Sequence, residues 1–414
     1  MKFLMRYFTT PTISLGFLSA ISASTFIYLY HFGTHWPWLQ AFLGTIALLS
    51  WLLLPPRAMF WSGFFTGVFW FWWIGMSFRY YELTWMIPFV IFAVGLVYGI
   101  LFGLVGALPH PAFRAVAVGL LEFVHPFGFD WFRPALMFTG SVLGDLLWQL
   151  WLLLAILTIV LSFKRRGRYL AFALLFFTIQ HPSRVDRHPD LEALKHSVQI
   201  VQTNIEQDKK WQPRYRNAIV ELNLHAIRLA MESGKKAVIL PESAFPLYLN
   251  HDIELVEKLI DLSRRITIVT GSLYYEKEKS YNSTYLFRDG RMRVMHKVVL
   301  VPFGEAVPLP KWMGRWINDI FFDGASDYVT AANPSDFEMA GKVWRNAICY
   351  EATSDRLYED DPQYMCAMSN NAWFTPSTEP TLQRLLMRLQ AHRHGTVVFH
   401  ATNGPGTGVI TPYQ

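Results

Sequence analysis

The chain has 414 residues, of which 52% are hydrophobic and only 16% are charged, and its formal net charge is +6. This composition is too apolar for an ordinary soluble protein, and the length allows more than one domain. The basic residues do not gather into a stripe with interleaved aromatic residues, so the charge does not indicate a nucleic-acid-binding surface. Two cysteines, both in the second half, exclude a disulfide framework.

The apolar residues are concentrated in the first half of the chain. Residues 12–180 contain nearly all the long apolar runs, whereas residues 181–414 have the charge density and mixed pattern of a water-soluble domain. We therefore predict a membrane-embedded helical bundle over residues 1–182, followed by a globular domain over residues 196–414.

Five stretches have the length of about 20 apolar residues that a helix needs to cross a bilayer. They are residues 12–30, 37–54, 58–78, 85–108 and 135–162. Two shorter stretches, 113–124 and 169–180, have a length at which a crossing and a re-entrant or buried segment both remain open.

Basic residues predict the orientation of these segments. Lys2, Arg6 and the run "KRRGR" at 164–168 flank apolar stretches and are expected on the cytoplasmic side. An even number of crossings must then precede residue 164, which requires 113–124 to be the sixth. With 169–180 as the seventh, the bundle has about seven helices and the globular domain lies outside the inner membrane.

Three polar residues interrupt the apolar half: Glu122, Asp145 and Gln149. A carboxylate within a membrane costs about 2.5–3.5 kcal/mol on insertion scales. Asp145 and Gln149 are spaced i, i+4, so we expect them on one face of a helix. A hydrogen bond that holds the bundle together is favoured there over a contact with lipid or substrate.

From residue 196 onward, short β-rich runs alternate with helical ones. Strands are expected at 196–205, 237–243, 266–276, 364–371 and 396–403, and helices at 213–233, 251–264 and 379–394. Two hairpins, over 283–301 and 337–351, are predicted to turn at Asp-Gly and Ala-Gly. Strands that alternate with helices, with hairpins between them, predict a layered α/β sandwich.

Three chemically apt residues lie at the ends of predicted strands: Glu242 in "LPES", Lys297 in "MHKVVLVPFGE" and Cys349 in "ICYE". Sites in layered α/β folds assemble at strand ends. A thiol with a pKa of about 8.5 needs a base to become a nucleophile, and an ammonium is a natural stabiliser of an oxyanion. Each residue also has a purely structural interpretation, as a helix-terminal carboxylate, a solvated lysine or a core cysteine.

This trio, embedded in "PES", "HKVVLVPFGE" and "CYE", resembles the nitrilase (carbon-nitrogen hydrolase) superfamily. Over nearly the whole chain, the sequence resembles the apolipoprotein N-acyltransferase family. The motifs that carry this resemblance are "VQTNIEQDKKW" (201–211), "LPESAFP" (240–246), "VPFGEAVPL" (301–309), "SNNAWF" (369–374) and "HATNGPGTGVI" (400–410). The resemblance implies an αββα sandwich outside the membrane, attached to a polytopic helical bundle.

The resemblance also implies roles for individual residues. Glu242 would be the general base, Lys297 the oxyanion stabiliser, and Cys349 the nucleophile that takes an acyl chain from a phospholipid as a thioester. Glu305, in "PFGE", matches a second carboxylate beside this triad. Three further residues match positions that shape the site and the access of substrate: Trp211, Tyr350 and Glu351.

The partners implied by the resemblance are a phospholipid acyl donor, a diacylglyceryl-cysteine lipoprotein as acceptor, and membrane lipid. No cofactor, metal or nucleic acid is expected. The family's location is the bacterial inner membrane, with several crossings and a periplasmic catalytic domain.

Two features of the sequence depart from simple expectations. The segment "WMGRWINDIFF" (312–322) is apolar within the globular half, and is either a packed insertion or an arm that dips into the membrane. Typical family members continue past the position of Gln414 with further strands and a last transmembrane helix, so we expect a shortened variant.

Two alternative functions stay open. One is a membrane-tethered amidase or nitrilase that acts on a small soluble amide with the same triad. The other is an accessory protein of conjugal transfer of the TraB type, which also resembles a nitrilase domain on a membrane segment.

Overall fold

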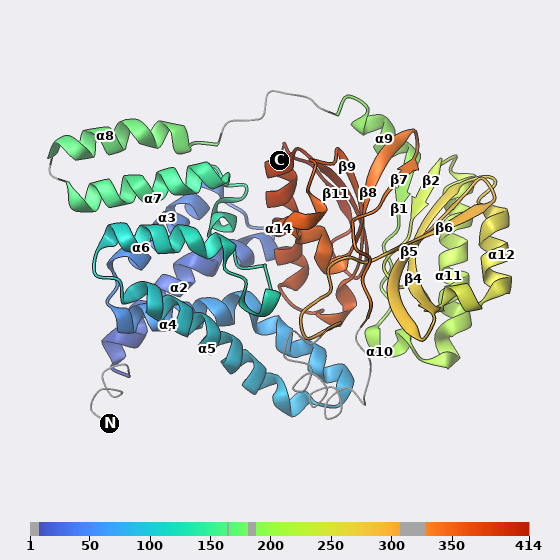
Figure 1. Cartoon of the computed structure of the whole chain (residues 1–414), viewed down its shortest axis with the longest axis horizontal. Coiled ribbons are helices and arrows are strands. Elements are labelled where there is room, and N and C mark those ends of the chain that lie inside the picture. Colours follow the sequence, from blue (N-terminus) through green and yellow to red (C-terminus); the bar gives the residue numbers. More distant parts are fainter. Residues whose placement is uncertain (1–7, 164, 181–187, 307–327, 414) are drawn as a thin grey trace. The chain divides into compact units, whose positions relative to one another are not determined.

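The computed structural model describes residues 8–163, 165–180, 188–306 and 328–413 (Figure 1). The chain forms two compact units, residues 1–182 with 377–385, and residues 183–376 with 386–414. The apolar segment 312–322 lies outside the described residues, as do Lys2, Arg6 and Lys164. The expectations attached to them stay predictions.

The first unit is helical. Its helices are α2 (Thr10–His31), α3 (Pro37–Leu53), α4 (Pro56–Phe71), α5 (Ile87–Gly106), α6 (Pro111–Leu120), α7 (Leu147–Ser162) and α8 (Arg165–Leu175). A proline occupies the first or second position of α2 through α6, where its missing N–H group costs no helical hydrogen bond. After Phe71 the chain continues as a 3₁₀ helix, Trp72–Tyr81, so the α-helix predicted over 58–78 ends early.

Two described stretches, Thr10–His31 and Thr84–Gly106, are long and apolar enough to cross a membrane. Shorter apolar helices cover Pro37–Leu53, Leu147–Ser162 and Tyr169–Thr178. Helix α6 has 10 residues, and at 1.5 Å per residue it is about half as long as the hydrocarbon core is thick. Helix α6 alone therefore does not form the sixth crossing that the charge pattern requires, and the total number of crossings stays a prediction.

The helix predicted over 135–162 is wrong in its first half. Pro134–Phe138 forms a 3₁₀ turn, and α7 begins only at Leu147. Two glycines explain the break. Gly140 has a φ of 77°, and at Gly144 a Cβ atom would lie 1.9 Å from the Gln149 side chain.

Asp145 therefore precedes the helix, and its predicted placement with Gln149 on one helix face is wrong. Gln149 Oε1 instead accepts a hydrogen bond from Leu146 N at 3.2 Å, and its amide donates to Ile179 O at 3.3 Å. The buried Glu122 accepts from Ala135 N at 3.1 Å. Gln149 and Glu122 thus satisfy backbone groups of non-helical turns, which would otherwise be costly in an apolar environment.

The second unit contains two sheets. The first has the order β1-β2-β4-β5-β6, with β3 beside β4, and the second has the order β11-β10-β9-β8-β7. The strands of the first are β1 (Val198–Ile200), β2 (Ala237–Ile239), β3 (Phe245–Tyr248), β4 (Thr267–Glu276), β5 (Lys279–Arg288) and β6 (Arg291–His296). Those of the second are β7 (Asp336–Met339), β8 (Lys342–Ile348), β9 (Tyr364–Asn370), β10 (Val397–Asn403) and β11 (Gly408–Ile410). The predicted hairpins β5–β6 and β7–β8 are confirmed, whereas β3 and β11 were not expected.

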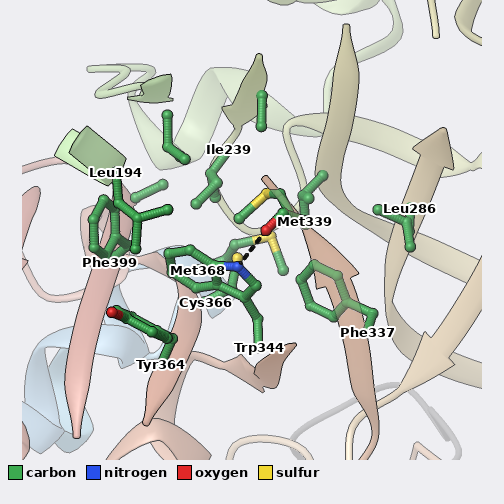
Figure 2. Packing of buried hydrophobic residues seen from close by; sticks show 14 of the residues in the cluster. Leu194, Ile239, Leu286, Phe337, Met339, Trp344, Tyr364, Cys366, Met368 and Phe399 are labelled. Carbon is green, nitrogen blue, oxygen red and sulfur yellow. Dashed lines mark hydrogen bonds between the residues drawn. The ribbon is translucent and has the colours of Figure 1, made fainter. Parts of the chain in front are cut away.

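The two sheets pack face to face through one apolar core (Figure 2). Ile239 and Leu286 of the first sheet share this core with Trp344, Cys366 and Phe399 of the second. Helices of this unit are α9 (Leu191–Ser197), α10 (Gln207–Lys210), α11 (Pro213–Glu232), α12 (Ile253–Leu262) and the part of α14 (Glu379–His394) from residue 386 onward. The outer face of the first sheet packs against α11 and α12, and that of the second against the end of α14 (Figure 1). The predicted αββα sandwich is thereby confirmed.

The direction of the strands determines where polar side chains meet. Strands β1, β2 and β4 are parallel, as are β8, β9 and β10. The carboxyl ends of parallel strands lie at one edge of a sheet, and the loops that leave them are free to carry polar groups.

Candidate active site

Cys349 directly follows β8 and opens the short 3₁₀ helix Cys349–Thr353. Its φ of 57° lies in the left-handed region, which is uncommon for a residue other than glycine. The residues on either side, Ile348 and Tyr350, are buried, whereas Cys349 is half-buried. The strained turn therefore presents the thiol at the strand end, and strain of this kind is typical of functional positions.

Glu351 connects this turn to the loop that carries Lys297. Its Oε2 accepts hydrogen bonds from Val298 N at 2.8 Å and Val299 N at 3.0 Å, and its Oε1 accepts from Ile348 N at 2.9 Å. Burial raises the pKa of Glu351 to about 7, against the opposing effects of the Lys297 charge and the three backbone N–H groups. One carboxylate thus fixes the turn at Cys349, called the elbow below, relative to the loop that follows Lys297.

Lys297 directly follows β6 and is completely buried. Its Nζ lies 2.7 Å from Glu305 Oε2. Burial lowers the pKa of Lys297, but the carboxylates of Glu305 and Glu242 outweigh this effect, so that the pKa is raised and the ammonium stays charged. Apart from this ion pair, the described residues accept no hydrogen bond from Nζ. The ammonium therefore retains N–H groups for an oxyanion.

Asn282, on β5, joins two carboxylates of the site. Its side-chain amide donates to Glu242 Oε1 at 2.8 Å and to Glu305 Oε1 at 3.0 Å. Glu305 is further held by a hydrogen bond from Val301 N to its Oε2, at 2.9 Å. The ion-paired carboxylate and the predicted base are thereby placed side by side.

Glu242 lies three residues beyond β2 and is 7% exposed. Besides Asn282, it is bonded by the backbone N–H group of Asn370, which reaches Oε2 at 2.8 Å from the end of β9. The turn at Glu242 passes close to Gly271 of β4, where a Cβ atom would lie only 2.7 Å from Glu242 Cα. Both sheets therefore contribute to the position of this carboxylate.

A hydrogen-bonded network of asparagines holds the backbone group that binds Glu242. Sequence reasoning did not identify this network. Asn370 donates to Gln207 Oε1 and accepts from Asn403, each at 2.8 Å. Asn403 in turn accepts from Ile205 N at 2.8 Å. These residues lie within the quoted motifs "SNNAWF", "HATNGPGTGVI" and "VQTNIEQDKKW". They carry no ionisable group, so an analysis based on nucleophiles and bases passes over them.

The structure brings together most of the predicted site residues. Glu242, Glu305 and Lys297 are linked through Asn282 and the ion pair, and the charge of Lys297 interacts with Cys349. The remaining two predicted residues are Tyr350 and Trp211. Tyr350 is buried, and its carbonyl accepts a hydrogen bond from Thr353 Oγ1 at 2.7 Å. Trp211 is 39% exposed and lines a cavity of about 730 Å³ together with residues of β3.

Comparison with known proteins assigns both units. Residues 197–407 match the carbon-nitrogen hydrolase family, the class that the sandwich and its strand-end thiol already indicate. Residues 10–181 match the apolipoprotein N-acyltransferase integral membrane domain. A chain that carries these two domains in this order belongs to the apolipoprotein N-acyltransferase family.

Relatives support this along the whole chain. The apolipoprotein N-acyltransferase of Wolinella succinogenes is 43% identical over 407 residues, which cover 98% of this chain and 97% of that protein. That of Helicobacter pylori is 35% identical over 377 residues, 90% of this chain and 88% of its own. Among solved structures, an amidase from Nesterenkonia sp. aligns over 52% of this chain and 82% of its own, with 15% identity and a TM-score of 0.39.

Proposed function

We propose that this membrane protein transfers an acyl chain from a phospholipid to the N-terminal amine of a diacylglyceryl-cysteine lipoprotein, with Cys349 as the covalent carrier. One observation carries the proposal. A strained strand-end thiol interacts with the charge of Lys297, which is paired with Glu305 and joined through Asn282 to the carboxylate of Glu242. The same chain contains apolar helices long enough to cross a membrane.

In the first half-reaction, Glu242 takes the proton of the Cys349 thiol, and the sulfur attacks the carbonyl carbon of a phospholipid ester. A carbon–sulfur bond forms, and the negative charge on the carbonyl oxygen is stabilised by the Lys297 ammonium. Collapse of this intermediate breaks the ester carbon–oxygen bond. The departing alkoxide of the lysophospholipid receives the proton from Glu242, and the acyl thioester remains on Cys349.

In the second half-reaction, the α-amino group of the lipoprotein attacks the thioester. Glu242 takes a proton from the attacking nitrogen while Lys297 again stabilises the oxyanion. Breakage of the carbon–sulfur bond releases the amide, and the Cys349 thiolate recovers a proton from Glu242. One set of groups thus serves both steps, as a ping-pong mechanism requires.

The Lys297–Glu305 ion pair supports this chemistry through its burial. Charges interact more strongly away from water than at the surface. Because Glu305 keeps Lys297 charged, the stabilising group is in place before the oxyanion forms, and no reorganisation is needed during the reaction.

The same proposal locates the protein in the bacterial inner membrane, with several crossings and with the catalytic unit on the periplasmic side. The acyl ester of a phospholipid lies at the membrane surface, so tethering the thiol to the membrane supplies the proximity that the first step needs. Trp211 and Tyr350 are proposed to shape the access of substrate.

The test is to incubate the purified protein with a phospholipid labelled in its acyl chain. We expect a hydroxylamine-sensitive label on the protein that is absent from Cys349→Ala and present in the matched control Cys366→Ala. Label that persists in Cys349→Ala would refute the assigned nucleophile. Release of ammonia from a small amide without any lipid adduct would favour an amidase instead.

Complementation provides an independent test. Expression of the chain should restore growth to a strain depleted of its own lipoprotein acyltransferase, and Cys349→Ala should not. Failure of the folded, membrane-inserted chain to rescue growth would count against the proposal and for an accessory role.

A further inference from the structure

Lys210, the last residue of α10, is a second buried lysine near the predicted triad. It is 1% exposed and is among the largest fully buried side chains. Its Nζ donates to the main-chain oxygen of Glu242 at 3.0 Å, which is the one hydrogen bond that the described residues accept from it. A buried ammonium is costly unless its charge is compensated, so the partners of this charge need to be identified.

The charges of the site show what Lys210 compensates. Lys297 is engaged by Glu305 at 2.7 Å. The carboxylate of Glu242, by contrast, is bonded within the described part of the chain only by neutral donors, the Asn282 amide and the Asn370 N–H group. The charge of Lys210 interacts with both Glu242 and Cys349. Lys297 and Lys210 are thus two cations beside three carboxylates, Glu242, Glu305 and Glu351, and loss of Lys210 would make the surroundings of the sulfur more negative.

We propose that Lys210 is a positioning residue that anchors the backbone of Glu242 and supplies the positive charge that favours the Cys349 thiolate over the thiol. The inference rests on the roles of Glu242 and Cys349 in the proposed function. It adds a second cation with a different task, because Lys297 acts on the oxyanion whereas Lys210 acts on the base and the nucleophile.

The acid–base behaviour of Lys210 agrees with this assignment. Burial lowers the pKa of Lys210 to about 8, against the opposing effects of Glu242 and Cys349. The side chain is therefore charged at neutral pH, where a free thiol is still largely protonated. The charge of Lys297 also interacts with Cys349, but it is unchanged when only Lys210 is altered.

The experiment measures the rate of alkylation of Cys349 by iodoacetamide as a function of pH, in full-length protein that carries Cys366→Ala so that one thiol reports. Lys210→Met removes the charge and the donor, Lys210→Gln removes the charge and keeps a donor, and Lys210→Arg keeps both. We expect the midpoint of the pH profile to rise by about one unit in Lys210→Met and Lys210→Gln, with a roughly tenfold slower reaction at pH 7. Lys210→Arg should keep the midpoint of the parent protein.

A purely structural role would lower the activity without moving this midpoint. An unchanged midpoint in folded Lys210→Met or Lys210→Gln overturns the proposal, even if acyl transfer is lost. If Lys210→Met does not fold, Lys210→Gln carries the test. Alkylation needs no lipid, so its result stands whether or not the protein forms an acyl adduct, and failure of the proposed function is thereby distinguished from failure of this inference.

Discussion

Two neighbouring strands of the second sheet carry the two cysteines, one just past the end of β8 and one within β9, and the two thiols lie in opposite surroundings. Cys349 follows the end of β8 with a φ of 57°, half-buried and within reach of the Lys297 charge. Cys366 lies within β9, opposite Asn346 of β8, and is completely buried between the sheets (Figure 2). Burial raises the pKa of Cys366. Position along a strand, rather than residue type, thus separates a partly accessible thiol near a cation from a fully buried one.

The largest expected difference is in the reaction of the two thiols with iodoacetamide. In the native protein, Cys349 should be alkylated faster than Cys366 by more than about a thousandfold, because only Cys349 combines access with nearby cations. Mass spectrometry of peptides over time measures both rates. In denaturant the two rates should become similar, which serves as the control. Similar alkylation rates in the native protein would show that the surroundings of Cys349 and Cys366 do not set the reactivity of the two thiols.

A second prediction concerns Lys297, the buried cation whose charge interacts with Cys349. Lys297→Met should slow acylation of Cys349 by about a hundredfold to a thousandfold, since one oxyanion donor is removed. Lys258→Met, which removes a surface lysine paired with Glu221, should have no measurable effect. Single-turnover labelling with the acyl-labelled phospholipid measures both. A loss of less than tenfold in folded Lys297→Met would contradict the role of Lys297.

A third prediction concerns the carboxylate that fixes the elbow. The three backbone N–H groups donate to both carboxylate oxygens of Glu351, whereas Glu351→Gln keeps only one acceptor oxygen. At least one buried N–H group therefore loses its acceptor. The expected cost is about 1–3 kcal/mol of stability, seen as a lower Tm of the purified protein, together with slower acylation. A Tm equal to that of the parent protein would show that the elbow does not depend on Glu351.

This cost should also depend on pH. The folded-state pKa of Glu351 is raised from 4.5 to about 7, so between these values the folded protein holds a proton that the unfolded chain has lost. The associated stability is complete below pH 4.5 and is lost as the pH rises to about 7. The difference in Tm between the parent protein and Glu351→Gln should therefore be larger at pH 5 than at pH 8. A larger difference at pH 8 than at pH 5 would contradict the raised pKa of Glu351.

The smallest expected effect is at the other thiol. Cys366→Ala should cost about 1 kcal/mol of stability, since a small apolar group is lost from the core, and should leave acyl transfer within twofold of the parent protein. Thermal unfolding and the transfer assay measure the two quantities. Loss of transfer in a folded Cys366→Ala protein would mean that the core thiol takes part in the chemistry.

Parts of the fold could be predicted from the sequence because local chemistry determines them. The Asp289–Gly290 and Ala340–Gly341 turns fixed both hairpins. Glycine-containing turns of this type match the twist of antiparallel strands. The start of α7 could not be predicted in the same way. A largely apolar run continues through residues 135–146, and the helix is interrupted by the positive φ of Gly140 and by the close approach of Gln149 to Gly144.

The site also contains residues that could be predicted from the sequence and residues that could not. Glu242, Lys297 and Cys349 carry ionisable groups at predicted strand ends, so chemical reasoning selects them. Asn282 and Lys210 each contact Glu242 from an element that is far away in sequence. Such contacts have no local signature, and a neutral amide or one lysine of "KK" gives no reason to be singled out before the fold is known.

The side-chain amide of Asn282 donates one hydrogen bond to each of two carboxylates, so substitutions at these residues should affect one another. Both of its N–H groups are committed, so a rotated amide would turn its oxygen toward two carboxylates and be repelled. The amide that holds Glu242 also holds Glu305, which is the ion-pair partner of Lys297. Glu242 and Glu305 are thus coupled through Asn282, and double substitutions across Asn282 should be strongly non-additive.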